Sequence, residues 1–362
     1  MALDTARTIA TLRGLTQRFD IVVQGAEPYY PQKSTTFISG GRDEGYGGLG
    51  NVSGMREWLG DRIFNSLNAA SFTIANKLWE SSLAIEKVDI EDDRLNMYGP
   101  IFDQLGVEAT FHPDELMFNL QMAGDSTVCM DGQYFYDVDH SWGKSGIQSN
   151  KLSCSISVPA WAVSTAYTAG TTVRANGNQY ICMTSGTSAS TGAGPSTTAV
   201  GITDGTVTWN YLQGSIPSED DCRRAYWMMV NQLLGFKRDS GKPFHRPTLA
   251  PITDLVLEVP PALTDVFNKA LLKQYINWGQ SNLIYSPPAK IVPVAYFTDP
   301  LSIYLHRVGQ PLKPFAFQAR RPLARQMKGL DDREFKDVKF MTDARYNVGF
   351  LAWWNSVKLT FS

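Results

Sequence analysis

Hydrophobic side chains recur every three or four residues along several stretches of the chain, which is the spacing of one face of a helix. Five stretches share this pattern: residues 2–18, 53–68, 93–124, 220–234 and 264–272. The pair His112-Pro113 interrupts the longest of them. Because proline lacks a backbone N–H and restricts the residue before it, we predict a break or two separate helices there.

Alternating apolar residues predict strands in the last part of the chain. The stretches concerned are residues 292–297, 302–306, 315–319 and 345–361. Residues 72–90 combine alternation with charge, so the pattern leaves strand and helix open there.

Residues 20–52 are rich in Pro, Gly, Ser and Tyr and have no hydrophobic period. A structureless segment of this length is unusual inside a compact domain, but it suits an arm that lies across neighbouring subunits. We therefore predict that this segment becomes ordered only in an assembly.

Residues 161–212 differ in composition from the rest, because Thr, Ser, Gly and Ala dominate and the charged residues are Arg174 and Asp204. Short alternating runs at 171–174, 179–183 and 206–211 lie between glycine turns and predict strands. We predict a small, autonomous all-β module at the outer surface of any assembly.

Composition favours a protein with extensive contacts. Charged residues make up 19% of the 362 residues, below the roughly 25% of ordinary soluble domains, and aromatic residues make up 12%. Subunit interfaces are poor in charge and rich in aromatic side chains, although a large core would have the same effect. With 33 basic and 35 acidic residues, the net charge of −2 gives no general attraction to nucleic acid.

The four cysteines, at 129, 154, 182 and 222, form no C-x-x-C pair, so we expect buried free thiols rather than a metal or redox site. Residues 1–20 lack the apolar core of a signal peptide, and no apolar run approaches the roughly 18 residues that span a bilayer. We therefore expect a protein made in the cytoplasm.

Several patterns imitate catalytic or binding motifs. Residues 45–50 match G-x-G-x-x-G, but no parallel-sheet pattern follows them, so glycine flexibility is the simpler interpretation. Asp137, Asp139 and His140, with Asp131 nearby, offer too few oxygens for a cation loop and are typical of a turn. Residues 91–93 are acidic, which the dipole at the start of a helix favours without any acid–base role. The four histidines are too scattered to indicate a catalytic triad, and no G-x-S-x-G motif of a nucleophilic serine occurs. We predict no catalysis, no cofactor and no metal.

The order of several motifs along the chain does resemble one known family. These motifs are residues 76–80 (NKLWE), 88–93 (VDIEDD), 132–140 (GQYFYDVDH), 255–263 (LVLEVPPAL), 313–315 (KPF) and 343–350 (DARYNVGF), the last followed by Trp353-Trp354. Together they resemble the Mu-like phage major head subunits, which are capsid proteins. Residues 157–213 depart from that pattern as an insertion.

The resemblance implies an α+β fold of the Hong Kong 97 capsid type. It implies an N-terminal arm at residues 1–53, an extended loop at 54–92, and a peripheral domain with a spine helix at 93–124 and 319–362. An axial domain follows at 125–318, interrupted by the β module at 157–213.

Two groups of side chains are candidates for binding. Arg320, Arg321, Arg325 and Lys328 form the densest basic cluster, which could contact DNA phosphates or, as we favour, acidic groups of a neighbouring subunit. In the inserted module, Trp161, Tyr167, Tyr180 and Trp209 follow a pattern that resembles a chitin-type carbohydrate-binding domain. They could stack on sugars, but we favour a core role, since a module of some 50 residues needs the area that aromatic rings bury.

The function implied by the resemblance is self-assembly into the head shell of a tailed double-stranded DNA phage. The implied partners are copies of the chain in hexamers and pentamers, portal, scaffold or protease proteins, a decoration protein, and packaged DNA contacted non-specifically, with no membrane. The implied location is the virion, after assembly in the host cytoplasm. The alternative is a carbohydrate-binding surface protein whose activity lies in the β module.

Overall fold

The fold comes from a computed structural model of the whole chain. It describes residues 2–47, 71–86, 89, 97–141, 144–214, 217–238, 240–245, 254–273, 275–276, 280–281, 289–328 and 337–362. The predicted helix at 53–68 and the acidic residues 91–93 therefore lie outside the described residues.

The contacts divide the chain into two compact units, which we describe separately. Unit 1 contains residues 1–150, 233–247 and 306–356, and unit 2 contains residues 151–232, 248–305 and 357–362. Within the described residues, no helix is both long and apolar enough to cross a membrane.

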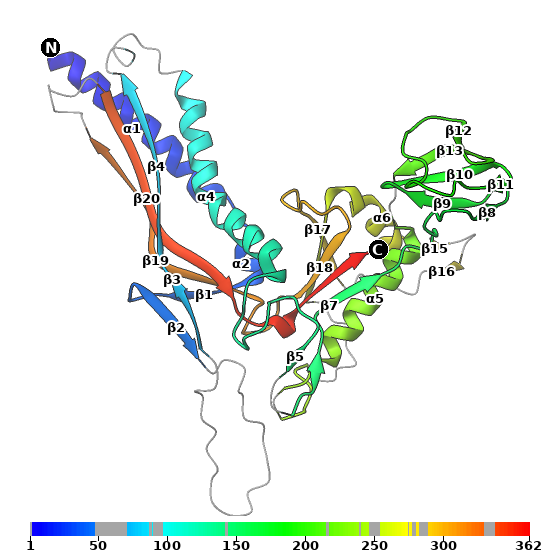
Figure 1. The fold of residues 1–362 in the computed structure, drawn as a ribbon. Coiled ribbons are helices and arrows are strands. Elements are labelled where there is room, and N and C mark those ends of the chain that lie inside the picture. The colour runs from blue at the N-terminus through cyan, green and yellow to red at the C-terminus, as the bar shows by residue number, and fades with distance from the viewer. Residues whose placement is uncertain are drawn as a thin grey trace, which may run out of the picture. The chain divides into compact units, whose positions relative to one another are not determined.

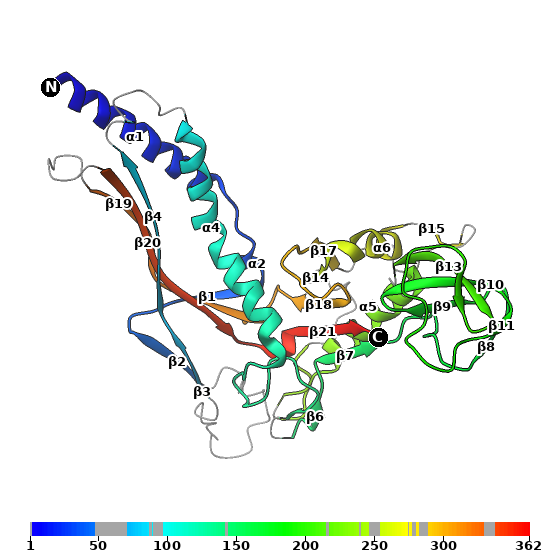
Figure 2. The ribbon, with the colours of Figure 1, turned by 45° about the horizontal axis from the view of Figure 1, so that its top comes forward.

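Unit 1 is built on a sheet with the strand order β1-β19-β20-β4. The strands are β1 (Ser34–Ile38), β4 (Lys77–Glu86), β19 (Phe315–Lys328) and β20 (Asp337–Phe350). β1 runs parallel to β19, and the other neighbours are antiparallel. Two helices, α1 (Ala2–Gly25) and α4 (Gly99–Met122), lie together on one face of this sheet in both views (Figures 1 and 2).

The helices and the sheet share one hydrophobic core. Its buried members are Leu12, Leu15, Phe19, Ile85, Phe102, Leu105, Val338 and Phe340. The rings of Phe19 and Phe102 lie 5.3 and 4.9 Å from that of Phe340. Burial of each such side chain stabilises the fold by roughly 1.5–3 kcal/mol relative to an exposed position. The apolar face of the two helices therefore packs on the apolar face of the sheet.

The expected break at Pro113 was wrong, because α4 continues through it from Gly99 to Met122. Pro113 cannot donate to the carbonyl of Ala109, so the helix loses one hydrogen bond there. Buried side chains lie on both sides of the proline: Phe102 packs against Phe340 of β20, and Phe118 stacks on Tyr29. That burial offsets the roughly 3 kcal/mol that an internal proline costs.

The prediction of an unpacked arm at residues 20–52 was wrong for its described part, residues 20–47. α1 extends to Gly25, and the short helix α2 (Tyr30–Lys33) leads into β1. Lys33 is fully buried, donates to Gln121 Oε1 and lies 3.7 Å from the centroid of the Phe118 ring. The segment therefore packs on its own subunit, since the amide and the aromatic ring replace the water around the ammonium group.

Residues 72–90, which the sequence left open, contain strands. β2 (Asp43–Gly47) and β3 (Ser71–Ala75) form an antiparallel hairpin that leads into β4. The hairpin packs against the β19–β20 pair, because the Ile74 side chain lies so close to Gly349 that a Cβ there would clash. Tyr46 donates to Gln318 Oε1 at 2.7 Å across the same contact.

The predicted strand at 345–361 is two strands in different sheets. β20 ends at Phe350, a 3₁₀ turn (Trp353–Asn355) follows, and β21 (Ser356–Phe361) continues. Apolar and polar residues alternate on both sides of the turn, so the sequence pattern does not reveal it. The Trp353 side chain is fully buried and anchors the turn.

Unit 2 contains a second sheet with the order β17-β14-β18-β21-β7. Its strands are β7 (Lys151–Cys154), β14 (Leu255–Val259), β17 (Ala289–Pro293), β18 (Ser302–Arg307) and β21. The helices α5 (Glu219–Gly235) and α6 (Pro261–Leu272) confirm two sequence predictions with small extensions. β17 lies earlier than the predicted 292–297 and ends at Pro293. Val294, which follows the strand, is nevertheless buried.

The inserted module has the predicted strands. β9 (Thr172–Ala175), β10 (Asn178–Thr184), β12 (Ile202–Asp204) and β13 (Val207–Gly214) form a sheet, and β8 (Ala166–Tyr167) pairs with β11 (Gly186–Thr187). Its own core consists of Val173, Ala175, Tyr180, Cys182, Val207 and Trp209. At Gly205 (φ +64°) a Cβ would meet the backbone of Thr187, so the turn between β12 and β13 requires glycine.

Candidate functional site

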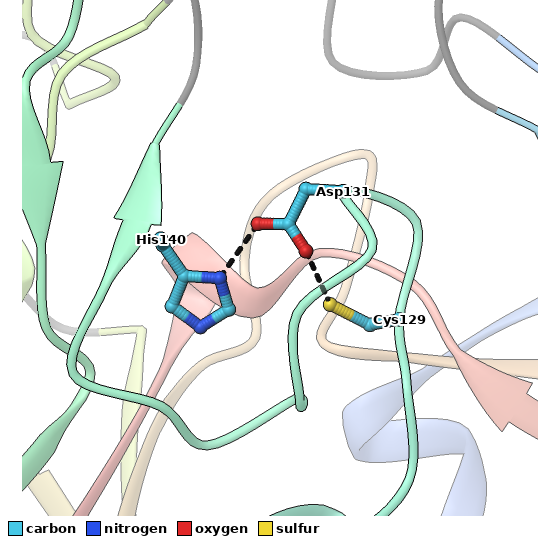
Figure 3. A group of neighbouring side chains, drawn as sticks. All are labelled: Cys129, Asp131 and His140. Carbon is cyan, nitrogen blue, oxygen red and sulfur yellow. Dashed lines mark hydrogen bonds and ion pairs between the residues drawn. The ribbon is translucent and has the colours of Figure 1, made fainter.

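The densest group of chemically versatile side chains in the described residues is Cys129, Asp131 and His140 (Figure 3). Asp131 Oδ2 lies 2.6 Å from His140 Nδ1, and Asp131 Oδ1 accepts from the Cys129 thiol at 3.0 Å. The three candidate ligand atoms lie within 4.8 Å of one another. These are donor types that zinc uses.

Hydrogen bonding already satisfies this group. Both Asp131 oxygens accept hydrogen bonds, and Oδ1 also accepts from the Gln133 N–H at 3.3 Å. Burial acts to raise the pKa of Asp131, but the hydrogen bond from His140 and the smaller ones outweigh it, so the net pKa is lowered. Burial raises the pKa of the Cys129 thiol, which keeps its proton. We interpret the group as a structural one.

The group joins the loop after α4 to the Trp353 turn. The His140 ring stacks on that of Trp353, with centroids 4.0 Å apart and planes inclined by 5°. Asn150 accepts from His140 Nε2 at 3.3 Å, and it donates to the carbonyls of Phe135 and Trp353. The motif at 132–140 and the Trp353-Trp354 pair thus meet in one packed network.

The other acidic residues of that loop do not join His140. Asp137 accepts from the N–H groups of Tyr134 and Val138, as a turn carboxylate does. Asp139 is exposed. Sequence reasoning therefore named Asp131 and His140 but missed Cys129, for which the two-residue spacing from Asp131 was the available signal.

The remaining motif-like residues are separated. The described part of the G-x-G-x-x-G stretch, through Gly47, lies in the antiparallel β2–β3 hairpin. His112 bonds Tyr346, His245 bonds Arg307, and His306 bonds Ser356. All four cysteines are free and buried, as expected.

The basic cluster lies along β19, and most of its charge is used within the chain. Arg320 donates to the Gly41 carbonyl, Arg321 pairs with Asp343, and Arg325 pairs with Asp20 of α1 through two nitrogens. Lys328 is exposed at the end of the strand. Sequence reasoning did not single out Arg345, which lies on β20 directly opposite Arg321.

The module aromatics are mostly internal. Tyr180 and Trp209 are fully buried, and Trp161 and Tyr167 are half-buried against them. The indole N–H groups of Trp161 and Trp209 both donate to Asp204 Oδ2, at 2.7 and 2.9 Å. One of the two charged residues in the module therefore holds its core together.

Comparisons with known proteins match the first part of the chain, which contains the motifs at 76–80, 88–93 and 132–140. Residues 9–168 match the family described as Mu-like prophage major head subunit gpT. The chain is 35% identical over 142 residues to the Mu-like prophage FluMu major head subunit of Haemophilus influenzae, covering 39% of this chain and 46% of that one. It is 37% identical over 118 residues to the major capsid protein of Escherichia phage Mu, covering 33% and 39%.

The chain thus spans less than half the length of these curated relatives. The resemblance to Mu-like head subunits is confirmed over residues 9–168. The motifs at 255–263, 313–315 and 343–350 lie outside that range.

Solved structures show the fold. The bacteriophage PhiM1 mature capsid and the capsid of cyanophage P-SCSP1u each align with a TM-score of 0.51 and 10% identity, covering 93% of this chain and 88% of theirs. The chain therefore has the Hong Kong 97-type fold of phage capsid proteins, mixed α+β as predicted.

Proposed function

We propose that this chain is the major capsid protein of a tailed phage and that it self-assembles into the head shell around double-stranded DNA. One observation carries the proposal: a match to major head subunits over residues 9–168, on a chain that has the capsid fold. The role is structural, without catalysis or cofactor, and the location is the virion, after assembly in the host cytoplasm.

The physical basis of assembly is burial of surface between copies. The edge strand β1 ends in Ile38, which is 92% exposed, and the opposite edge strand β4 carries Leu78, which is 63% exposed. Unpaired strand edges and exposed apolar side chains favour association with another chain. Capsid contacts would cover them.

The parts of the capsid fold are assigned as the resemblance implies. We assign residues 1–53 to the arm, 54–92 to the extended loop, 93–124 with 319–362 to the peripheral domain, and 125–318 to the axial domain. The insertion at 157–213 is a separate module. Its core contains Tyr180 and Trp209, which favours a structural over a sugar-stacking role for these rings.

The partners are copies of the chain in hexamers and pentamers, with portal, scaffold or protease proteins during assembly and a decoration protein afterwards. Packaged DNA is contacted non-specifically, and the net charge of −2 gives no general attraction that would hold it tightly.

Expression of the full chain followed by negative-stain microscopy and sedimentation tests the proposal. Shells, rings or capsomers are expected. A discrete monomer under all conditions, retained on insoluble chitin, would instead favour the carbohydrate-binding alternative.

A further inference from the structure

The sheet of unit 1 is covered by helices on one face only (Figures 1 and 2). Side chains alternate along β20, so Phe340, Thr342, Ala344 and Tyr346 point toward α4 and are buried, whereas the residues between them point away. The β2–β3 hairpin covers the second face near Gly349. Beyond the hairpin, nothing in the described chain covers this second face, which we call the open face.

Next to the hairpin, three neighbouring strands place two arginines and a leucine in one row across the open face. Arg345 is directly opposite Arg321 on one side and Leu78 on the other. Like charges directly opposite each other on neighbouring strands are destabilising. These residues, with Arg320 and Ser39, line a hollow of about 710 Å³ at the edge of the hairpin.

The charges in this hollow are incompletely balanced. Asp343 pairs with Arg321, and Arg320 donates to a backbone carbonyl. No carboxylate in the described part of the chain is paired with Arg345. The hollow therefore fits an acidic group, and Leu78 beside it supplies apolar area.

The helix-covered side of the same unit carries the complementary charge. Glu108 and Glu115 are exposed on α4, and neither is paired with a lysine or arginine in the residues that the structure describes. They border a pocket of about 220 Å³ with Trp79, His112 and Tyr346. Burial lowers the pKa of His112, so this ring does not balance the two carboxylates.

We propose that the α4 surface around Glu108 and Glu115 of one copy docks on the open face of the next copy, with the carboxylates at Arg345. The inference rests on the proposed capsid function and names the surfaces that assembly uses. The carboxylates offset the repulsion between Arg321 and Arg345, which the strand register places opposite each other, and the contact covers Leu78.

A helix surface on a sheet surface is a heterologous contact, because the two partners use different patches. Repetition of such a contact closes a ring when the rotation allows it. A single copy cannot make this contact with itself, because α4 and the open face are on opposite sides of one sheet.

A charge exchange in the full chain tests the proposal. Arg345→Glu alone, and Glu108→Arg with Glu115→Arg, should each lower the yield of shells at least about tenfold, since like charges then face each other. The triple variant should restore assembly. Lys242→Glu is the matched control, because Lys242 is exposed and lies away from these surfaces in the sequence, and its shells should be normal.

Circular dichroism and thermal melting confirm that each variant folds. A triple variant that assembles no better than Arg345→Glu, or an Arg345→Glu variant that assembles like wild type, overturns the proposed contact while the capsid function stands. Wild-type protein that never assembles overturns both.

A second measurement does not depend on assembly yield. Leu78→Cys and Glu115→Cys proteins are mixed, assembled and treated with a short bismaleimide. Cross-linked dimers that contain one copy of each variant are expected, and their absence from intact mixed shells contradicts the contact.

Discussion

Ser157 donates two hydrogen bonds to Asp221, from its backbone N–H at 3.1 Å and from its hydroxyl. Asp221 also accepts from the N–H and hydroxyl of Ser218, at 3.0 and 2.9 Å, and its own N–H donates back to that hydroxyl at the start of α5. One carboxylate thus caps the helix and joins the segments before and after the inserted module.

Deletion of the module with Val158 joined to Ser215 should therefore leave a folded subunit that still assembles. Ser157 and Asp221 already hold the two ends close together, so closing the gap requires little rearrangement. Negative-stain microscopy of the deletion variant is the measurement. Insoluble protein or unassembled subunits would mean that the module is integral to the shell.

Trp209→Ala should unfold the module and leave the rest of the chain intact. Trp209 is fully buried in the module core and donates to Asp204, so removal of the ring should cost the module about 3–5 kcal/mol. Hydrogen exchange is expected to accelerate in residues 161–214 but not in α4. The control is Trp227→Ala, since Trp227 is 45% exposed on α5 and its loss should change stability little. Slow exchange throughout the module of the Trp209 variant would contradict a separate core.

Asp131→Asn should reduce stability at neutral pH and not in strong acid. The folded state lowers the pKa of Asp131, so the charged carboxylate adds stability above its unfolded pKa of about 4 and loses it as the pH falls through the folded value. Loss of a buried charged partner of His140 should cost on the order of 1–3 kcal/mol at pH 7. Urea unfolding of both proteins at several pH values measures the difference.

Asp139→Asn is the matched control for that series, since Asp139 is exposed in the same loop. It should unfold like wild type at every pH. A gap between wild type and Asp131→Asn that persists unchanged below pH 3 would show that ionisation of Asp131 is not its cause.

The sequence predicted elements whose hydrophobic period repeats, such as α5, α6 and the module strands. It could not predict that α4 continues through Pro113. The hydrogen bond that proline removes is visible in the local sequence, but the burial of Phe102 and Phe118 that offsets its loss depends on residues far along the chain. The break at Trp353 was missed for a similar reason: β20 and β21 alternate alike, and only the pocket that buries the indole separates them.

The candidate surfaces were predictable only in part. Consecutive arginines in β19 are visible in the sequence, but which of them is paired depends on residues far along the chain, such as Asp20 and Asp343. Arg345 was not singled out, since its proximity to Arg321 comes from strand register.

Arg325 should matter less for assembly than Arg345, although it belongs to the densest basic run. It forms a two-nitrogen pair with Asp20, and both side chains are partly exposed. Exposed pairs stabilise by about 0–1 kcal/mol, so a double-mutant cycle of Arg325→Gln and Asp20→Asn should give a coupling within that range. Shells of Arg325→Gln should form in normal yield and package DNA normally. A loss of shells or of packaged DNA in this variant, with unchanged thermal stability, would show that Arg325 contacts a neighbour or the genome instead of Asp20.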